Sequence, residues 1–430
     1  MLSAFVNAFR TPDLRRKLLF VLFVIALFRL GSAIPTPGVD YQNVQTCVAS
    51  VKGQGIYGLI NLFSGGALLQ LTIFALGIMP YITASIILQL LTVVIPRLET
   101  LKKEGQAGTA KITQYTRYLT LGLAILQSTG IVALARTGQI FQNNCDLPLL
   151  VNDNVSTLLL MVVTMSAGTA MIMWLGELIT ERGIGNGMSI LIFTSVVASF
   201  PTALWGIKQQ HGWDIFAIVV AIGLIIIAAV IFIEQAQRRI PVQYARRMVG
   251  RRMFGGTSTY IPLKVNQAGV IPVIFASSLL YLPTLATQFN PTAPWSRWVG
   301  NHFVRGDHPY YMLTYFLLIV FFTYFYVAIT FNPTEVADNM KKYGGFVPGI
   351  RAGRPTEEYL AYVLSRITFP GALYLGLVAL VPLIAFVLIN ANQNFPFGGT
   401  SLLIMVGVGL DTVKQIESQL QQRHYEGFLR

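Results

Sequence analysis

The chain has 430 residues, of which 54% are hydrophobic and only 11% are charged, and its formal net charge is +13. A soluble protein of this length needs about 25% charged residues to cover its surface. The composition therefore excludes a water-soluble protein of several domains and predicts an integral membrane protein whose surface faces lipid.

Ten apolar stretches, each close to the roughly 20 residues with which a helix crosses a bilayer, follow one another along the chain. They lie near residues 18–36, 72–95, 117–135, 155–176, 184–204, 213–233, 266–286, 309–331, 367–389 and 398–416. Of the 31 lysines and arginines, 25 fall in the N-terminus, the even-numbered connections and the C-terminus, and five fall in the odd-numbered connections. Because positive charge accumulates on the cytoplasmic side, both termini are predicted to be cytoplasmic.

The first span follows a basic segment and ends at Ile34-Pro35-Thr36-Pro37 without a small-residue cleavage site. We therefore interpret it as a retained helix and not as a signal peptide. One arginine, Arg29, lies inside this span.

Residues 56–95 form an uncharged stretch of 40 residues, about twice the length that one span needs. Ser64-Gly65-Gly66 interrupts it, and glycine pairs break helices. We divide it into a short element, 56–70, and a span that begins near Thr72. The short element cannot cross the membrane, so it is expected to lie inside protein or to line a cavity. The alternative is a helix at the outer membrane interface.

A short repeat relates the second and seventh spans. Residues 78–85 read IMPYITAS and residues 270–277 read VIPVIFAS. The copies lie five spans apart, and an odd number of spans inverts the second copy, which places functional sites between the halves. Chance similarity between apolar helices is the alternative. The predicted fold is an all-α membrane protein of ten transmembrane helices in two inverted halves, 1–204 and 205–430.

Two long cytoplasmic connections carry a large share of the basic residues. Residues 235–264 hold seven arginines and lysines and have hairpin character at Gly255-Gly256-Thr257, and residues 332–366 hold five. A basic connection of this kind commonly serves topology or touches anionic lipid. The density in 235–264 exceeds that need, so we predict a docking surface for RNA or for a protein with a negative face.

Residues that could carry enzymatic chemistry are missing from the middle of the spans. Glu177, Glu181 and Glu234 lie at cytoplasmic span ends, and the four histidines lie outside the spans. A proton-driven transporter normally needs buried carboxylates, and nucleotide hydrolysis needs a glycine-rich phosphate loop with its lysine. We therefore predict a passive pathway that is not an enzyme and that has no cofactor. A secondary solute transporter and a lipid flippase or scaffold are the rival interpretations.

Both cysteines, Cys47 and Cys145, fall in predicted external connections. Two unpaired residues are favoured over a disulfide, and the spacing fits no metal site.

Several long motifs stand in an order typical of one family. They are INLFSGGALLQLTIFALGIMPYITASIILQLLTVVIPR (60–97), MWLGELITERGIGNGMSILIF (173–193), RRIPVQYARRMVGRR with STYIPLKVNQAGVIPVIFASS (238–278), FVPGIRAGRPT (346–356) and FGGTSLLI (397–404). With these motifs the chain resembles, over essentially its whole length, the SecY family of channel subunits of the bacterial protein translocase.

The resemblance implies ten helices around an hourglass pore that opens sideways to lipid between helices two and three and helices seven and eight. It implies that a short plug helix at 56–70 blocks the external funnel, with Asn61, Leu62, Phe63, Ser64, Gly65 and Gly66 at its centre. The pore constriction, called the ring residues below, would be Ile78, Ile82, Met188, Ile192, Ile271, Ile274 and Ile404. Methionine at 188 departs from the commoner isoleucine but is apolar and adaptable enough for the role.

The resemblance also implies polar gate residues, docking residues and partners. Ser85, Gln127 and Asn266 would form the polar cluster of the lateral gate, for which ordinary contacts between helices are the alternative. Docking would involve Arg239, Arg246, Arg247, Arg251, Arg252 and Arg351. The implied partners are SecE, SecG, the SecA ATPase, the ribosome, a secretory precursor with its signal sequence, and anionic lipid, all at a bacterial plasma membrane.

Overall fold

A computed structural model describes the chain from Phe9 to Glu426, apart from Arg10 and the segments 51–63, 138–146, 245–246, 250–251, 255–257, 290–292, 305–307 and 390–398. Its helices are α2 (Pro12–Gly31), α3 (Tyr41–Ser50), α5 (Met79–Val94), α6 (Pro96–Lys103), α7 (Gln106–Thr137), α8 (Val155–Arg182), α9 (Gly187–Gln235), α10 (Ile271–Phe289), α11 (Pro294–Val299), α12 (Pro309–Thr330), α13 (Pro333–Lys342), α14 (Arg354–Ile389) and α15 (Gly399–Glu426). A π-helical turn, η2 (Gly300–Val304), follows α11. The strands are β1 (Gln237–Tyr244), β2 (Arg247–Val249), β3 (Arg252–Phe254), β4 (Ser258–Lys264) and β5 (Gly345–Phe346).

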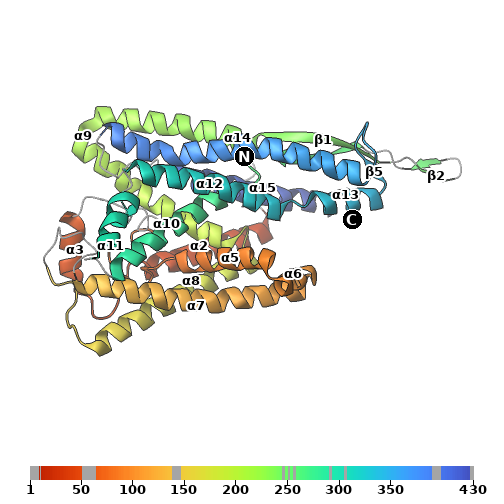
Figure 1. Cartoon of the computed structure of the whole chain (residues 1–430). Helices are drawn as coiled ribbons and strands as arrows, with labels where there is room; N and C mark the ends of the chain where they lie inside the picture. Colours follow the sequence, from red (N-terminus) through yellow and green to blue (C-terminus); the bar gives the residue numbers. More distant parts are fainter. Residues whose placement is uncertain are drawn as a thin grey trace.

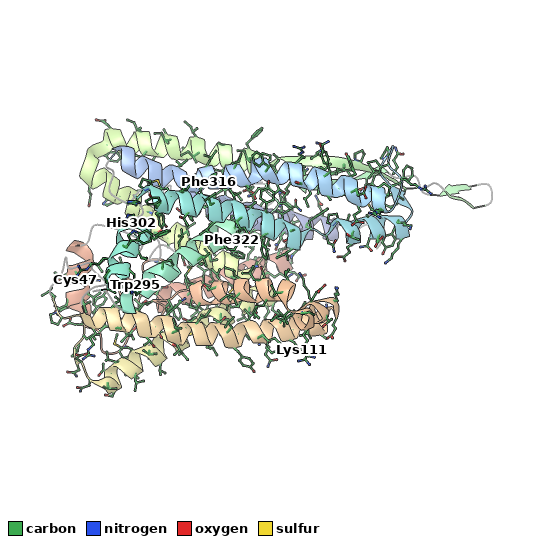
Figure 2. The ribbon with its side chains drawn as sticks, viewed as in Figure 1. Cys47, Lys111, Trp295, His302, Phe316 and Phe322 are labelled. Carbon is green, nitrogen blue, oxygen red and sulfur yellow. The ribbon has the colours of Figure 1, made fainter. Side chains whose placement is uncertain are left out.

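The long helices run side by side, and the connections gather at two opposite ends (Figure 1). The helices α3 and α11 lie at one end, while α6, α13 and the strand β2 lie at the other. Figure 2 places Cys47 and Trp295 at the first end and Lys111 at the second. The odd-numbered and even-numbered connections predicted from the charge pattern are therefore separated in space.

Each of the ten predicted spans contains a helix, but several helix boundaries differ from the prediction, and the difference in the second span matters most for the site. Residues 64–78 form turns, so the second helix begins at Met79 and not near Thr72. Gly65, Gly66, Leu71 and Gly77 have positive φ angles, which an α-helix cannot contain. Pro80 then lies in the first turn of α5, where its missing N–H costs nothing.

The fifth and sixth predicted spans both lie in α9, which breaks at Gly212 with φ 81° and ψ −175°. Between α5 and α6 the chain bends by 100°. The bend follows from Pro96, because Ile95 before it is held in extended conformation, with φ −98° and ψ 111°. Within the described residues five helices are long and apolar enough to cross a membrane, or six if α5 and α6 form one span. The count of ten crossings stays a prediction.

The two predicted cytoplasmic loops form one folded unit. In β1, buried Ile240 and Val242 alternate with exposed neighbours, the pattern of a strand with one packed face. This strand pairs antiparallel with β4 along most of its length, from Gln237 opposite Lys264 to Gln243 opposite Ser258, and with β5 at Tyr244 opposite Gly345. A small core beneath the sheet joins residues of both loops, among them Ile240, Val242, Leu263, Met340, Val347, Leu360 and Val363. The helical membrane fold therefore carries a β-sheet at the end where α13 lies (Figure 1).

Cys47 is fully buried in a second apolar cluster, which joins α3 to α7 and α8. It is disulfide-bonded, so the preference for two unpaired cysteines was wrong. Its only possible partner within the chain, Cys145, lies outside the described residues.

Candidate functional site

The two copies of the sequence repeat begin their helices in the same way. A glycine with positive φ precedes each copy, Gly77 at 57° and Gly269 at 62°. The helix then starts at the residue before the proline, and the first hydrogen bonds correspond. Ile82 N donates to Ile78 O at 3.2 Å, and Ile274 N donates to Val270 O at 3.3 Å. The repeated motif therefore builds one backbone geometry twice, and it places Ile82 and Ile274 at equivalent positions.

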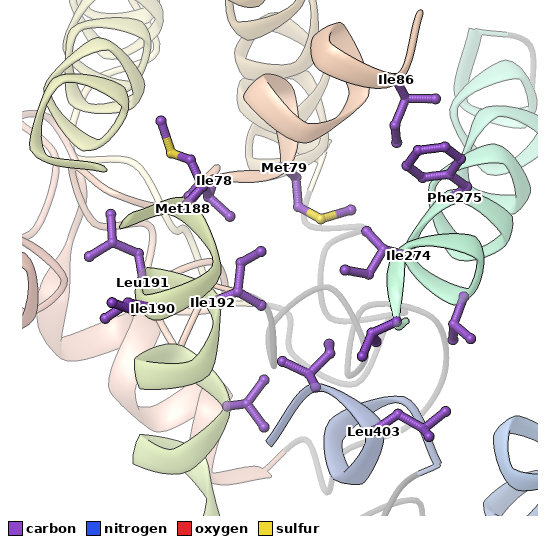
Figure 3. Packing of buried hydrophobic residues seen from close by; sticks show 14 of the residues in the cluster. Ile78, Met79, Ile86, Met188, Ile190, Leu191, Ile192, Ile274, Phe275 and Leu403 are labelled. Carbon is purple, nitrogen blue, oxygen red and sulfur yellow. The ribbon is translucent and has the colours of Figure 1, made fainter. Parts of the chain in front are cut away.

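All seven ring residues meet in the largest apolar cluster of the described chain. Ile78, Met188, Ile192, Ile274 and Ile404 are buried members, and Ile82 and Ile271 are partly buried against them. They come from the start of α5, from the first turns of α9, from α10 and from α15. Figure 3 shows Ile78, Met188, Ile192 and Ile274 converging from three of these elements. The cluster thus joins helices of both predicted halves.

Burial separates the ring residues from isoleucines that face outward. Ile192 and Ile404 are 5% and 1% exposed, whereas Ile218 and Ile225 on the second half of α9 are 56% and 69% exposed. A helix of a membrane protein turns such exposed apolar side chains toward lipid. The sequence alone offered no means of distinguishing these two groups.

The local structure around Gly176 and Asn186 holds Met188 in the cluster. Asn186 caps α9, because its side-chain oxygen accepts a hydrogen bond from Met188 N at 3.1 Å. On the facing helix α8, a Cβ atom at Gly176 would lie 2.4 Å from Met188 Sδ. Glycine at this position therefore lets the end of the Met188 side chain pack directly against the backbone of α8, and a larger residue would have to displace it.

The described part of the predicted plug, Ser64 to Gln70, consists of turns, so the expected helix is not present in these residues. Asn61, Leu62 and Phe63 lie outside the described residues. Ser64 is buried, and its Oγ accepts a hydrogen bond from Leu68 N at 3.0 Å. Gly65 and Gly66 have φ angles of 66° and 92°, which explains why the helix is broken here.

The end of this segment is joined to the residues after α2. Thr36 N donates to Leu71 O and Ile73 N donates to Ile34 O, each at 3.0 Å. The ring of Phe74 stacks on Phe28 with 5.9 Å between ring centroids. The segment therefore has a fixed base on the first span.

The three predicted gate residues do not bond to one another. Gln127 and Asn266 are buried and Ser85 is partly buried. Ser85 lies on α5, Gln127 on α7 and Asn266 just before α10, and α10 contacts both of the other helices. Within the described residues no hydrogen bond joins the three side chains. Asn266 Nδ2 instead donates to Glu234 Oε1 at 2.5 Å and to Gly269 O at 3.1 Å.

Sequence reasoning missed two polar contacts. One is the hydrogen bond of Asn266 to Glu234. From the sequence, Glu234 could be identified only as a carboxylate at the end of a span. The other is a two-pronged ion pair in which Arg117 Nε and Nη2 donate to the two carboxylate oxygens of Glu177, each at 2.8 Å. It joins α7 to α8, and nothing in the sequence spacing pointed to it.

The predicted docking residues that are described lie at the end of the molecule that carries the β-sheet. Arg239 on β1 is exposed, and its guanidinium lies over the Tyr260 ring at 4.9 Å from the centroid. The backbone of Arg247 and Arg252 pairs in the β2–β3 ribbon, which projects from the body (Figure 1). Arg246 and Arg251 lie outside the described residues.

Arg351 sits exposed in a turn between two glycines with positive φ, Gly349 at 80° and Gly353 at 105°. Its carbonyl accepts a hydrogen bond from Thr356 Oγ1 at 2.9 Å, which fixes the backbone and leaves the guanidinium directed outward. The turn predicted from the sequence is therefore confirmed.

Comparison with known proteins gives consistent results. Residues 72–413 match the family described as SecY. The chain is 70% identical over 438 residues to the protein translocase subunit SecY of Streptomyces galbus, with all of both chains covered. It is 61% identical over 444 residues to the subunit of the same name from Mycobacterium tuberculosis strain H37Rv, again with full coverage of both.

Two solved structures share the fold. One is described as a protein conducting channel, with a TM-score of 0.63, 18% identity, and coverage of 93% of this chain and 91% of the other. The second is Sec61 in the canine ribosome-channel complex from the endoplasmic reticulum, with a TM-score of 0.62, 19% identity and the same coverage.

Proposed function

The chain belongs to the SecY family and is a protein-conducting translocation channel, and we propose that polypeptides pass through the apolar cluster formed by the ring residues. The supporting observation is that all seven, drawn from both predicted halves, belong to one apolar cluster, whereas Ile218 and Ile225 on the second half of α9 are exposed. A closed apolar constriction excludes water and ions by dewetting, yet its side chains can move aside for a passing chain. The ring side chains thus form the inner part of the seal.

The segment around Ser64-Gly65-Gly66 would close the external funnel above this ring. Its base is fixed to the end of the first span by the two backbone hydrogen bonds at Leu71 and Ile73. Glycines with positive φ lie just before that base, where a segment that moves would need backbone freedom. Displacing the plug would then connect the funnel to the ring.

Membrane segments would leave sideways between α5 with α7 on one side and α10 with α12 on the other. The helix α10 contacts both α5 and α7, so the two pairs of helices pack against each other along this proposed exit. Asn266 forms no bond to Ser85 or Gln127 within the described residues, because its amide donates to Glu234 and to the carbonyl of Gly269. An apolar signal sequence could therefore part the helices by exchanging one set of apolar contacts for another.

The driving force would come from partners that dock on the sheet of the two cytoplasmic loops, and the chain itself would not be an enzyme. The SecA ATPase and the translating ribosome are the proposed motors, with SecE and SecG completing the complex. Arginine forks such as those of Arg239 and Arg351 suit carboxylate or phosphate partners, including anionic lipid. We place the channel in a bacterial plasma membrane with ten crossings and both termini in the cytoplasm.

Aqueous accessibility tests the proposed path. Cysteine would be placed at Ile274 in the ring and, as the matched control, at the outward-facing Ile225, in the reconstituted complex. A membrane-impermeant thiol reagent should label Ile274→Cys only while precursor is being transported, and should not label Ile225→Cys. Labelling of the control alone, or an Ile274→Cys that stays unlabelled during transport, would refute the path.

A further inference from the structure

A single cation, Arg29, lies in the last turn of α2, near the predicted external end of the first span. The positive-inside rule gives it no role there, because positive charge orients a span from the cytoplasmic side. It is half-buried, and within the described residues no carboxylate forms an ion pair with it. Ionisable residues inside membrane spans are rare and commonly functional.

The guanidinium of Arg29 bonds to the interrupted segment after the first span. Its Nη1 donates a hydrogen bond to the carbonyl oxygen of Gly65 at 3.1 Å. A Cβ atom at Gly65 would lie 3.0 Å from the same nitrogen and 3.3 Å from the Cα atom of Ser195. Gly65 is therefore held between α2 and α9.

The α9 side of this contact is close to the constriction. Ser195 is buried and lies one helical turn after the ring residue Ile192. The bond of Arg29 thus fixes the position of Gly65 directly against the helix that supplies Met188 and Ile192. At its other end the segment is tied to the first span through Leu71 and Ile73.

We propose that Arg29 is a positioning residue that latches the plug in its sealing place through the Gly65 carbonyl, and thereby sets how good a signal sequence must be to open the channel. This inference rests on the proposed function of the segment as a plug. The bond is charge-assisted and partly shielded from water, which makes it stronger than a neutral bond. The glycines with positive φ at Gly65 and Gly66 let the segment swing once the bond breaks.

A comparison of three arginine variants tests the latch in the reconstituted complex. Arg29→Gln removes the charge and the fork, while Arg29→Lys keeps a cation at the helix C-terminus but loses the planar donor geometry. Arg136→Gln is the matched control, because Arg136 also lies in the last turn of a span, where it pairs with Asp153. The readouts are resting ion conductance and the transport of a precursor with a defective signal sequence.

Arg29→Gln is expected to raise both readouts about tenfold, which corresponds to about 1.4 kcal/mol in the open-to-closed equilibrium. Arg29→Lys should give a smaller rise, and Arg136→Gln should leave both readouts at the level of the unmodified channel. If Arg29→Gln fails to assemble, Gly65→Ala perturbs the same contact from the other side with Arg29 intact. Its Cβ would crowd the guanidinium and would strain a backbone with φ 66°, so it should raise both readouts as well.

The deletion of residues 60–68 shows whether Arg29 acts through the plug. In the deleted channel, which leaks already, Arg29→Gln should add nothing. An equal added leak with and without the deletion would overturn the latch, and so would an Arg29→Gln channel that behaves as the Arg136→Gln control does. A deletion that causes no leak by itself would instead refute the plug, and the latch with it.

Discussion

Replacing Ile192 with asparagine should open the constriction, and the size of the effect follows from its burial. The side chain is 5% exposed within the apolar cluster. Losing its burial removes about 1.5–3 kcal/mol from the closed state. An amide left without partners there costs about 1–3 kcal/mol more. Even 1.4 kcal/mol of this difference would raise the open fraction about tenfold, because a hydrated, open ring does not penalise the amide.

The assay is ATP-driven transport of two precursors, one with an intact and one with a defective signal sequence, in vesicles with equal amounts of channel. The Ile192→Asn variant should transport the defective precursor at least about tenfold better than the unmodified channel does. The matched control is Ile225→Asn, at a side chain that is 69% exposed. A lipid-facing asparagine should reduce the amount of inserted protein without relaxing selectivity. Normal selectivity with reduced expression in Ile192→Asn would show that Ile192 is not a ring residue.

Three further changes have expected outcomes. Deleting residues 60–68 should raise resting conductance while the channel still assembles and transports, and an unchanged conductance in planar bilayers would contradict the sealing role. Arg351→Glu should abolish transport but leave SecE co-purification intact, since an exposed charge contributes only about 0–1 kcal/mol to folding; Arg351→Lys should also be impaired, and normal transport by the glutamate variant would refute docking. A double-mutant cycle with Arg117→Gln and Glu177→Gln should give a coupling of about 1 kcal/mol in thermal unfolding, because both donor–acceptor distances are 2.8 Å. Additive effects there would show that the pair does not hold α7 to α8.

The spans could be predicted because apolar length is a local property of the sequence. Their details depended on backbone geometry that composition does not encode. Leu71 has φ 48° although it is not glycine, and the turns through this region delay the second helix to Met79. The pairing of β1 with β5 joins residues about 100 positions apart, as at Tyr244 and Gly345, so no local pattern could indicate it.

The candidate site was predictable only in part. Isoleucine is common in membrane helices, so the ring positions came from family resemblance, and their burial in one cluster appears only in three dimensions. The glycines flanking Arg351 did indicate an exposed turn, because glycine is the residue that adopts positive φ without strain. Arg29 was visible as an unusual charge, but its bond to Gly65 depends on how the chain returns after the first span.

The most direct test of the central claim is to stall a secretory precursor inside the reconstituted complex and to map its contacts. A photoreactive residue would replace Ile192 or Ile404 in the ring and Ile218 or Ile225 on the outward face of α9. The account predicts crosslinks from the two ring positions to the stalled chain and crosslinks from the two outward positions to lipid or partner subunits. Crosslinks to the precursor from the outward positions, with none from the ring, would contradict it.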